Sequence, residues 1–174
     1  RSALALALSG LGNVCPNPAV GCVLVREDLN HRIVGRGWTQ YGGRPHAETQ
    51  ALQQAGPAAR GATAYVTLEP CAHQGHTGPC SLALIEAQLA RVVIATLDPD
   101  PRTAGKGVAM LRDAGIEVTM GVMESEAKQV NAGFIKRITT GRPYLTLKLA
   151  LSLDGKIALG NGESQWITGP PARA

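Results

Sequence analysis

Three short segments of the chain carry residue types that bind metals and move protons. His46 and Glu48 stand two residues apart, and Cys71 and Cys80 stand nine residues apart, each cysteine directly after a proline. Zinc takes histidine nitrogen and cysteine sulfur, and a catalytic zinc usually has three protein ligands and an open fourth position. One histidine and two cysteines fit that count, and two thiolates balance the charge of the ion. The pattern predicts a catalytic zinc held by His46, Cys71 and Cys80.

Glu48 would act beside the metal and not as a ligand. A carboxylate there could take a proton from the attacking water and return it to a ring nitrogen and to a leaving amine. Zinc deaminases use this scheme, with the signature H-x-E followed by P-C-x-x-C. Here eight residues separate the two cysteines instead of two. His73 and His76 lie in that insert as rival ligands, and His46 is preferred because it brings Glu48 with it.

The elements that would hold these residues follow from hydrophobic periodicity and from the glycines and prolines between periodic segments. The sequence predicts helices over 1–10, 46–55, 80–90, 105–114 and 125–138. It predicts strands over 19–26, 32–36, 62–68, 91–97 and 116–120, with a hairpin turn over 27–30. This alternation favours a three-layer α/β/α sheet architecture. The ligands would then lie where helices begin and where a strand ends.

A domain boundary is expected at the Gly-Arg-Pro segment 141–143. The first domain would cover 1–141, and the remainder, 142–174, would be the opening part of a second domain. A strand is predicted over 144–150, but so short a segment cannot build a core of its own. Its leucines, Leu145, Leu147 and Leu149, would be exposed and would favour self-association.

Composition narrows the classes of partner. The 174 residues carry a net charge of +4, with one Phe, two Trp and three Tyr. This charge suits an anionic small molecule, and so few aromatic residues argue against a surface that stacks nucleic-acid bases. No apolar run approaches the ~18 residues of a membrane span. Four cysteines without a secretion signal predict a cytoplasmic protein with reduced thiols, in which Cys15 and Cys22 are small buried residues.

The motifs together resemble the family of bifunctional riboflavin-biosynthesis enzymes, in which diaminohydroxyphosphoribosylaminopyrimidine deaminase is fused to 5-amino-6-(5-phosphoribosylamino)uracil reductase. The resemblance runs nearly end to end, and the eight-residue cysteine gap separates this family from cytidine and tRNA adenosine deaminases. The matching segments are Pro16 to Gly21, His46 to Glu48, Thr67 to His73, Gly75, Thr77, Pro79-Cys80, Asp98 to Pro101, Asn131 to Phe134, Lys148, Ser152 to Lys156 and Gly162 to Thr168.

The resemblance implies a fold, a reaction and a set of roles. The fold would be a cytidine-deaminase-like α/β/α domain followed by the truncated start of a dihydrofolate-reductase-like domain. The reaction would be hydrolytic deamination of 2,5-diamino-6-ribosylamino-4(3H)-pyrimidinone 5′-phosphate, a small phosphorylated pyrimidine. The zinc ligands would be His46, Cys71 and Cys80, the proton shuttle Glu48, and the substrate-binding residues Asn17, His76 and Asp98. In the reductase segment, Ser164 would meet substrate, and Ala150 and Trp166 would meet NADPH, although this segment alone is expected to be unable to reduce.

Three positions depart from the residues usual in the family. The family commonly has Lys or Arg at the position of His76, where the side chain faces the substrate phosphate. It has His at the position of Thr39 and Asn at the position of Asp100, whose charge is expected to lie at the surface. Arg44 is an alternative source of positive charge for the phosphate.

Two other functions remain open from the sequence. One is a nucleoside or tRNA deaminase of the same fold, against which the long cysteine gap and the reductase-like tail argue. The other is a non-catalytic binding module stabilised by zinc, against which the intact Glu48 argues. Assembly into a homo-oligomer is also compatible with the sequence.

Overall fold

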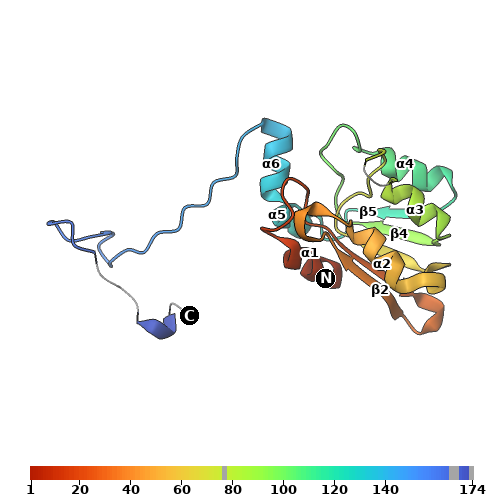
Figure 1. The fold of residues 1–174 in the computed structure, drawn as a ribbon, viewed down its shortest axis with the longest axis horizontal. Coiled ribbons are helices and arrows are strands. Elements are labelled where there is room, and N and C mark those ends of the chain that lie inside the picture. The colour runs from red at the N-terminus through yellow and green to blue at the C-terminus, as the bar shows by residue number, and fades with distance from the viewer. Residues whose placement is uncertain (76–77, 165–168, 173–174) are drawn as a thin grey trace. The chain divides into compact units, whose positions relative to one another are not determined.

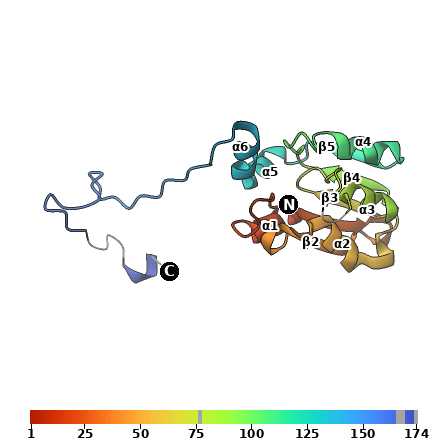
Figure 2. The same cartoon turned by 45° about the horizontal axis from the view of Figure 1, so that its top comes forward.

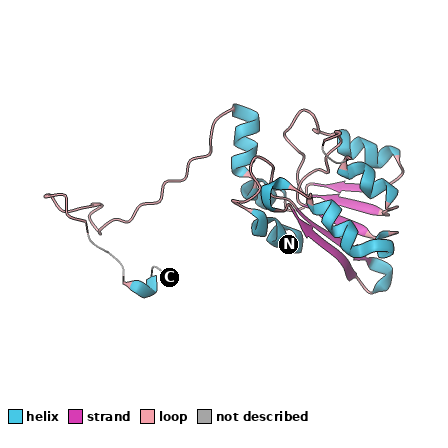
Figure 3. Ribbon diagram, in the orientation of Figure 1, coloured by secondary structure: helices cyan, strands magenta, loops and turns pink. Residues whose placement is uncertain are grey.

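The computed structural model describes residues 1–75, 78–164 and 169–172. The chain divides into two units, Arg1–Pro143 and Tyr144–Ala174. The first unit is a sheet with helices around it (Figure 3).

The sheet of the first unit has five strands in the order β2-β1-β3-β4-β5 (Figure 1). The strands are β1 (Gly21–Arg26), β2 (Arg32–Trp38), β3 (Thr63–Val66), β4 (Arg91–Ile94) and β5 (Glu117–Met120). β1 pairs antiparallel with both β2 and β3, whereas β3, β4 and β5 run parallel. All five strands predicted for this unit are confirmed, as is the turn after β1, where Asn30 adopts the left-handed conformation.

Helices cover both faces of this sheet, which confirms the three-layer α/β/α architecture (Figure 2). Helix α1 (Ser2–Gly10) packs on one face, where a Cβ on Gly21 of β1 would collide with the Ala3 carbonyl. Helices α2 (Ala47–Ala55), α3 (Cys80–Glu86) and α4 (Lys106–Asp113) pack on the other. Since alternate strand residues point to opposite faces, Cys22 and Leu24 point from β1 to the α2 side.

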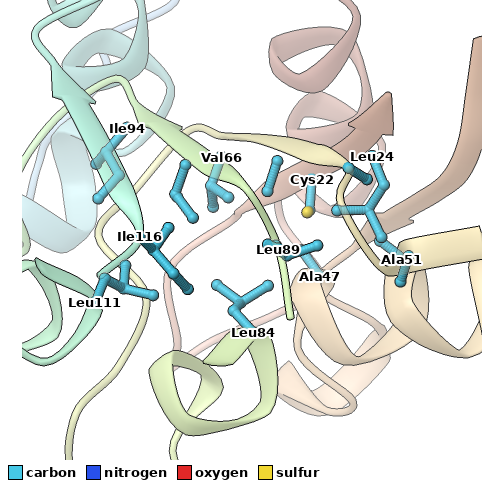
Figure 4. Packing of buried hydrophobic residues seen from close by; sticks show 14 of the residues in the cluster. Cys22, Leu24, Ala47, Ala51, Val66, Leu84, Leu89, Ile94, Leu111 and Ile116 are labelled. Carbon is cyan, nitrogen blue, oxygen red and sulfur yellow. The ribbon is translucent and has the colours of Figure 1, made fainter. Parts of the chain in front are cut away.

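The main hydrophobic core lies between the sheet and helices α2, α3 and α4. Figure 4 shows Cys22 and Leu24 near Ala47 and Ala51 of α2, with Leu84 and Leu111 contributed by α3 and α4. Burial of Cys22 is as predicted, but Cys15 is exposed, so the prediction of burial is wrong for Cys15. It lies in the irregular segment after α1, outside both packed faces.

Two glycines of β2 bring α2 unusually close to the sheet. A Cβ on Gly35 would collide with the backbone carbonyl of Ala51, and a Cβ on Gly37 would collide with that of Ala47. The side-chain oxygen of Gln50 accepts the Trp38 N–H at 2.9 Å, which adds a polar link between helix and strand. The start of α2, with His46 and Glu48, is therefore fixed against the sheet.

The long helix predicted over 125–138 is instead two helices, α5 (Glu124–Val130) and α6 (Ala132–Thr140). The break falls at Asn131, whose backbone leaves the helical conformation. Its side chain binds Ala19 at two points, accepting the Ala19 N–H at 2.8 Å and donating to the Ala19 carbonyl at 2.9 Å. This long-range contact orients α6 and explains why helical periodicity alone missed the break.

The second unit has little regular structure. Its described residues contain the short 3₁₀ helix Pro170–Ala172 and no β-strand, so the strand predicted over 144–150 is wrong for this chain. A strand needs a neighbour to satisfy its backbone groups, and the described residues 144–164 and 169–172 supply none. Exposure of the leucines is confirmed, since Leu145 is 84% exposed and Leu147 is 82% exposed. Among the described residues, no helix is long and apolar enough to cross a membrane.

Candidate active site

Two of the candidate metal ligands lie where helices begin, and the third lies in the segment after a strand. His46 is the N-cap residue of α2, Cys71 follows β3 after Pro70, and Cys80 is the first residue of α3. The first turn of α3 also binds Cys71 directly. The Cys80 N–H points at the Cys71 Sγ at 3.3 Å, and the Ser81 N–H and hydroxyl donate to the Cys71 carbonyl at 3.2 and 3.0 Å.

The ligand atoms of these three residues form a compact cluster. His46 Nδ1 lies 3.3 Å from Cys80 Sγ and 3.7 Å from Cys71 Sγ. All three ligand atoms lie within 4.8 Å of one another. Typical Zn–N and Zn–S bond lengths in a tetrahedral site place nitrogen and sulfur about 3.6 Å apart. The spacing of this nitrogen and these sulfurs therefore fits a single zinc ion.

The electrostatics of the two thiols also favour a cation. The pKa of Cys71 is lowered to about 4, because Cys80 donates a hydrogen bond to it and His46 lies beside it. The pKa of Cys80 is raised well above its ordinary value by its hydrogen bond to Cys71 and by burial. Two adjacent thiolates repel each other, and a divalent cation between them would offset that repulsion.

Glu48 lies beside this cluster, in the first turn of α2, and is only 4% exposed. Burial raises its pKa to about 7, with His46 opposing the rise and the charge of Cys71 adding to it. A carboxyl group whose pKa lies near neutrality can both accept and donate a proton under physiological conditions. The position suits the proton-shuttle role predicted for it.

A pocket of about 270 Å³ is lined by His46, Cys71 and Glu48. Asn17 lies in its wall, with its Nδ2 donating to the Gly43 carbonyl at 2.8 Å. Thr39 is buried in the wall as well, where its hydroxyl accepts the Val20 N–H at 3.0 Å. The full lining is Pro16, Asn17, Pro18, Val20, Thr39, Arg44, His46, Glu48, Leu68, Glu69, Cys71, His73, Asp98, Asp100, Arg102, Phe134, Arg137 and Ile138.

Asp98 and Asp100, in the loop between β4 and α4, both line the pocket. Burial raises the pKa of Asp98 to about 6, despite a hydrogen bond from the Asp100 N–H. Asp100 is buried, so its expected surface position is wrong. The chain turns back at Arg102, whose Nε lies 3.0 Å from both carboxylate oxygens of Asp100 and holds the pKa of that group below its ordinary value.

The remaining predicted site residues are the rival ligands and those of the reductase segment. His73 lines the pocket, but its Nδ1 lies 3.3 Å from the Thr103 hydroxyl, and it does not belong to the metal cluster found among the described residues. His76 and Trp166 lie outside the described residues. In the second unit, Ala150 is exposed and the Ser164 hydroxyl donates to the Ile157 carbonyl at 3.1 Å.

Sequence reasoning missed two parts of the pocket. Phe134, Arg137 and Ile138 reach it from α6, and Arg137 donates to the Pro16 carbonyl at 2.6 Å. Glu69 also lines it, as a buried carboxylate between three backbone N–H groups. The only signals were the places of Glu69 and Phe134 in segments that match the family, and neither showed that its side chain faces the pocket.

Comparison with known proteins defines the class. Residues 1–96 match the family model of the cytidine and deoxycytidylate deaminase zinc-binding region, and the chain belongs to this family of zinc-binding deaminases. Residues 143–174 match the RibD C-terminal domain. Zinc is therefore the metal that the cluster is built to hold.

The particular relatives are riboflavin biosynthesis proteins. The chain is 56% identical to RibD of Haemophilus influenzae over 174 residues, which is 100% of this chain and 46% of the relative. It is also 56% identical to RibD of Escherichia coli over 171 residues, 98% of this chain and 46% of the relative. The chain thus spans about half the length of the curated relatives it matches.

Solved structures agree with this relationship. RibD of Acinetobacter baumannii is 54% identical with a TM-score of 0.89, over 99% of this chain and 48% of that one. The diaminohydroxyphosphoribosylaminopyrimidine deaminase/5-amino-6-(5-phosphoribosylamino)uracil reductase of Thermotoga maritima is 47% identical with a TM-score of 0.90, over 97% of this chain and 48% of that one. The resemblance to the bifunctional riboflavin-biosynthesis enzymes is confirmed, and with it the cytidine-deaminase-like fold.

Proposed function

We propose that the chain catalyses the hydrolytic deamination of 2,5-diamino-6-ribosylamino-4(3H)-pyrimidinone 5′-phosphate. Water replaces the ring amine, giving 5-amino-6-(5-phosphoribosylamino)uracil and ammonia. The observation that carries the proposal is the cluster of His46, Cys71 and Cys80 with Glu48 beside it at one pocket. The choice of this substrate rests on the similarity to the RibD relatives, because a pocket of this kind does not by itself identify one pyrimidine.

In this proposal His46 Nδ1 and the sulfurs of Cys71 and Cys80 hold the zinc ion. Zinc bound there supplies a Lewis acid that activates the attacking water. Glu48 takes one proton from that water and delivers it to the ring nitrogen. It then takes the second proton, from the hydroxyl added to the ring carbon, and delivers it to the amine, which leaves as ammonia. Its buried position keeps the carboxyl out of bulk solvent, so the proton stays in the pocket between these steps.

The substrate is proposed to lie between the metal cluster and the polar wall. Asn17 and Asp98 would hydrogen-bond the pyrimidine or ribose, because amide and carboxyl groups match their donors and acceptors. His76 would face the 5′-phosphate. Arg44 and Arg137 also line the pocket, and guanidinium suits a phosphate partner.

The remaining assignments concern the whole protein. We propose that 1–141 is the deaminase domain and 142–174 belongs to an NADPH-dependent reductase domain, with Ala150 and Trp166 facing NADPH and Ser164 facing its substrate. We also propose a cytoplasmic location, where the ligand thiols stay reduced.

This chain is further proposed to self-associate through Leu145 and Leu147. Lysine at both positions should then lower the mean mass measured by light scattering, and an unchanged mass would contradict self-association.

The decisive experiment measures ammonia release by the zinc-loaded chain. The phosphoribosylated diaminopyrimidinone and cytidine are assayed side by side, with the Glu48→Gln variant as the blank. Release from the first compound alone supports the proposal. Release from cytidine alone would keep the zinc chemistry and replace the substrate, whereas release from neither, with zinc bound, would favour a non-catalytic zinc module.

A further inference from the structure

Glu69 is a buried carboxylate that the proposed reaction does not use. It is 3% exposed and lies two residues before Cys71. Its Oε2 accepts the Asp98 N–H at 3.2 Å and the Gly105 N–H at 3.0 Å. Its Oε1 accepts the Val108 N–H at 3.2 Å. Both oxygens of one side chain are thus engaged by backbone from another part of the chain.

These contacts join the two sides of the pocket. Glu69 belongs to the segment that leads from β3 to Cys71, and its own N–H donates to the Thr96 carbonyl at 3.0 Å. The N–H groups that it accepts belong to the loop that carries Asp98 and to the first turn of α4. A Cβ on Gly107 in that turn would collide with the Pro70 carbonyl, so α4 begins directly against the peptide before Cys71.

We propose that Glu69 is a positioning residue for deamination: its carboxylate fixes the Asp98 loop relative to the strand end that carries Cys71. The inference rests on the proposed function for its catalytic meaning. Asp98 lines the pocket from this loop, and its own backbone N–H donates to Glu69. A shift of this loop would move the substrate-facing wall while leaving the metal ligands in place.

The chemistry calls for a carboxylate and not an amide. An ionised carboxylate only accepts hydrogen bonds, and here three donors face its two oxygens. Glutamine has nearly the same shape, but its NH₂ group must face at least one of those N–H donors. Two buried donors then oppose each other, which is costly. Glu69→Gln therefore tests the hydrogen bonds without removing side-chain volume.

The test compares Glu69→Gln with Glu126→Gln, the same chemical change at an exposed glutamate. We expect Glu69→Gln to bind one zinc as the unchanged chain does, to raise KM about tenfold and to lower kcat less than threefold. Amide hydrogen exchange at Asp98, Gly105 and Val108 should speed up in that variant alone. Glu69→Asp keeps the carboxylate, which only accepts hydrogen bonds, on a shorter side chain. Its KM should lie between the KM of Glu126→Gln and that of Glu69→Gln.

The outcomes separate this inference from the proposed function. If the chain without substitutions releases no ammonia, the proposed function is rejected. The amide hydrogen exchange rates would still test whether Glu69 holds the Asp98 loop. Unchanged KM and unchanged exchange in Glu69→Gln would overturn the inference. Loss of zinc with an unchanged KM would also overturn it, because Glu69 would then serve the metal end and not the substrate wall. If Glu69→Gln does not fold, Glu69→Asp carries the same comparison.

Discussion

The two sides of the pocket are built in different ways. On the metal side, His46 and Cys80 lie where α2 and α3 begin, and backbone at the start of α3 supports Cys71 in the segment after β3. On the opposite side, Asp98 comes from a loop and Phe134 from α6, and these are held by side-chain hydrogen bonds to distant backbone. The metal side is thus fixed by the sheet and helices themselves, whereas the wall depends on single side chains such as Glu69 and Asn131.

This difference suggests a division of labour. Groups at the ends of packed elements keep their geometry, which a metal cluster requires. A wall held by a few polar contacts can differ between related proteins without disturbing the metal. Changes on the metal side should therefore affect the chemical step, and changes on the wall should affect substrate affinity and stability.

The largest effect is expected for Glu48→Gln. The glutamine cannot take up the proton of the attacking water, so kcat should fall by about 10²–10⁴-fold or more. Bound zinc, measured by atomic emission, should not change, because Glu48 is not a proposed ligand. Full turnover in this variant would show that Glu48 is not the proton shuttle, and that the chemical step does not depend on the metal side of the pocket in the way proposed.

Cys71→Ser and Cys80→Ser should each lower the zinc content of the purified chain. A serine hydroxyl is a poorer zinc ligand than a thiolate. Cys15→Ser is the matched control, because Cys15 is exposed and lies outside the cluster. Normal zinc binding by both ligand variants would show that the ligand set is wrong.

Asn131→Ala should act on the wall. It removes two hydrogen bonds to Ala19 and leaves a buried N–H without its partner. We expect the free energy of unfolding in urea to fall by about 2 kcal/mol, and KM to rise more than kcat falls. If zinc content dropped and KM did not change, α6 would support the metal side instead, and the comparison would fail.

The effect expected for Asp98→Asn depends on pH. The folded-state pKa of Asp98 is raised to about 6, above the ordinary value of 3.8. The folded state therefore binds the proton more tightly, and the free energy of unfolding contributed by Asp98 falls as the pH rises from about 4 through 6.

Asparagine removes this dependence while its side-chain oxygen still accepts the Asp100 N–H. Urea unfolding gives the free energy of unfolding of Asp98→Asn minus that of the original chain. This difference should be more positive at pH 8 than at pH 4. Asp113→Asn, at an exposed position, is the control. A stability difference that stays constant across this pH range would contradict the raised pKa.

The sequence by itself determined the metal side. His46, Glu48, Cys71 and Cys80 are identified by residue type and spacing, and the ends of the strands and helices that carry them follow from local signals. The cluster of ligand atoms agrees with the ligand set inferred from those residues. Local reasoning leads to this cluster because His46 and Cys80 stand where α2 and α3 begin and Cys71 follows β3. The ligand roles of these residues stay a prediction.

Only the tertiary structure decided the wall and the second unit. The break at Asn131 arises from a contact across 112 residues, and the burial of Asp100 arises from a turn that lets Arg102 fold back on it. The strand predicted over 144–150 has the right residue pattern but no neighbouring strand among the described residues. Such features depend on which backbone groups find partners, and periodicity along the chain carries no information about partners far away in sequence.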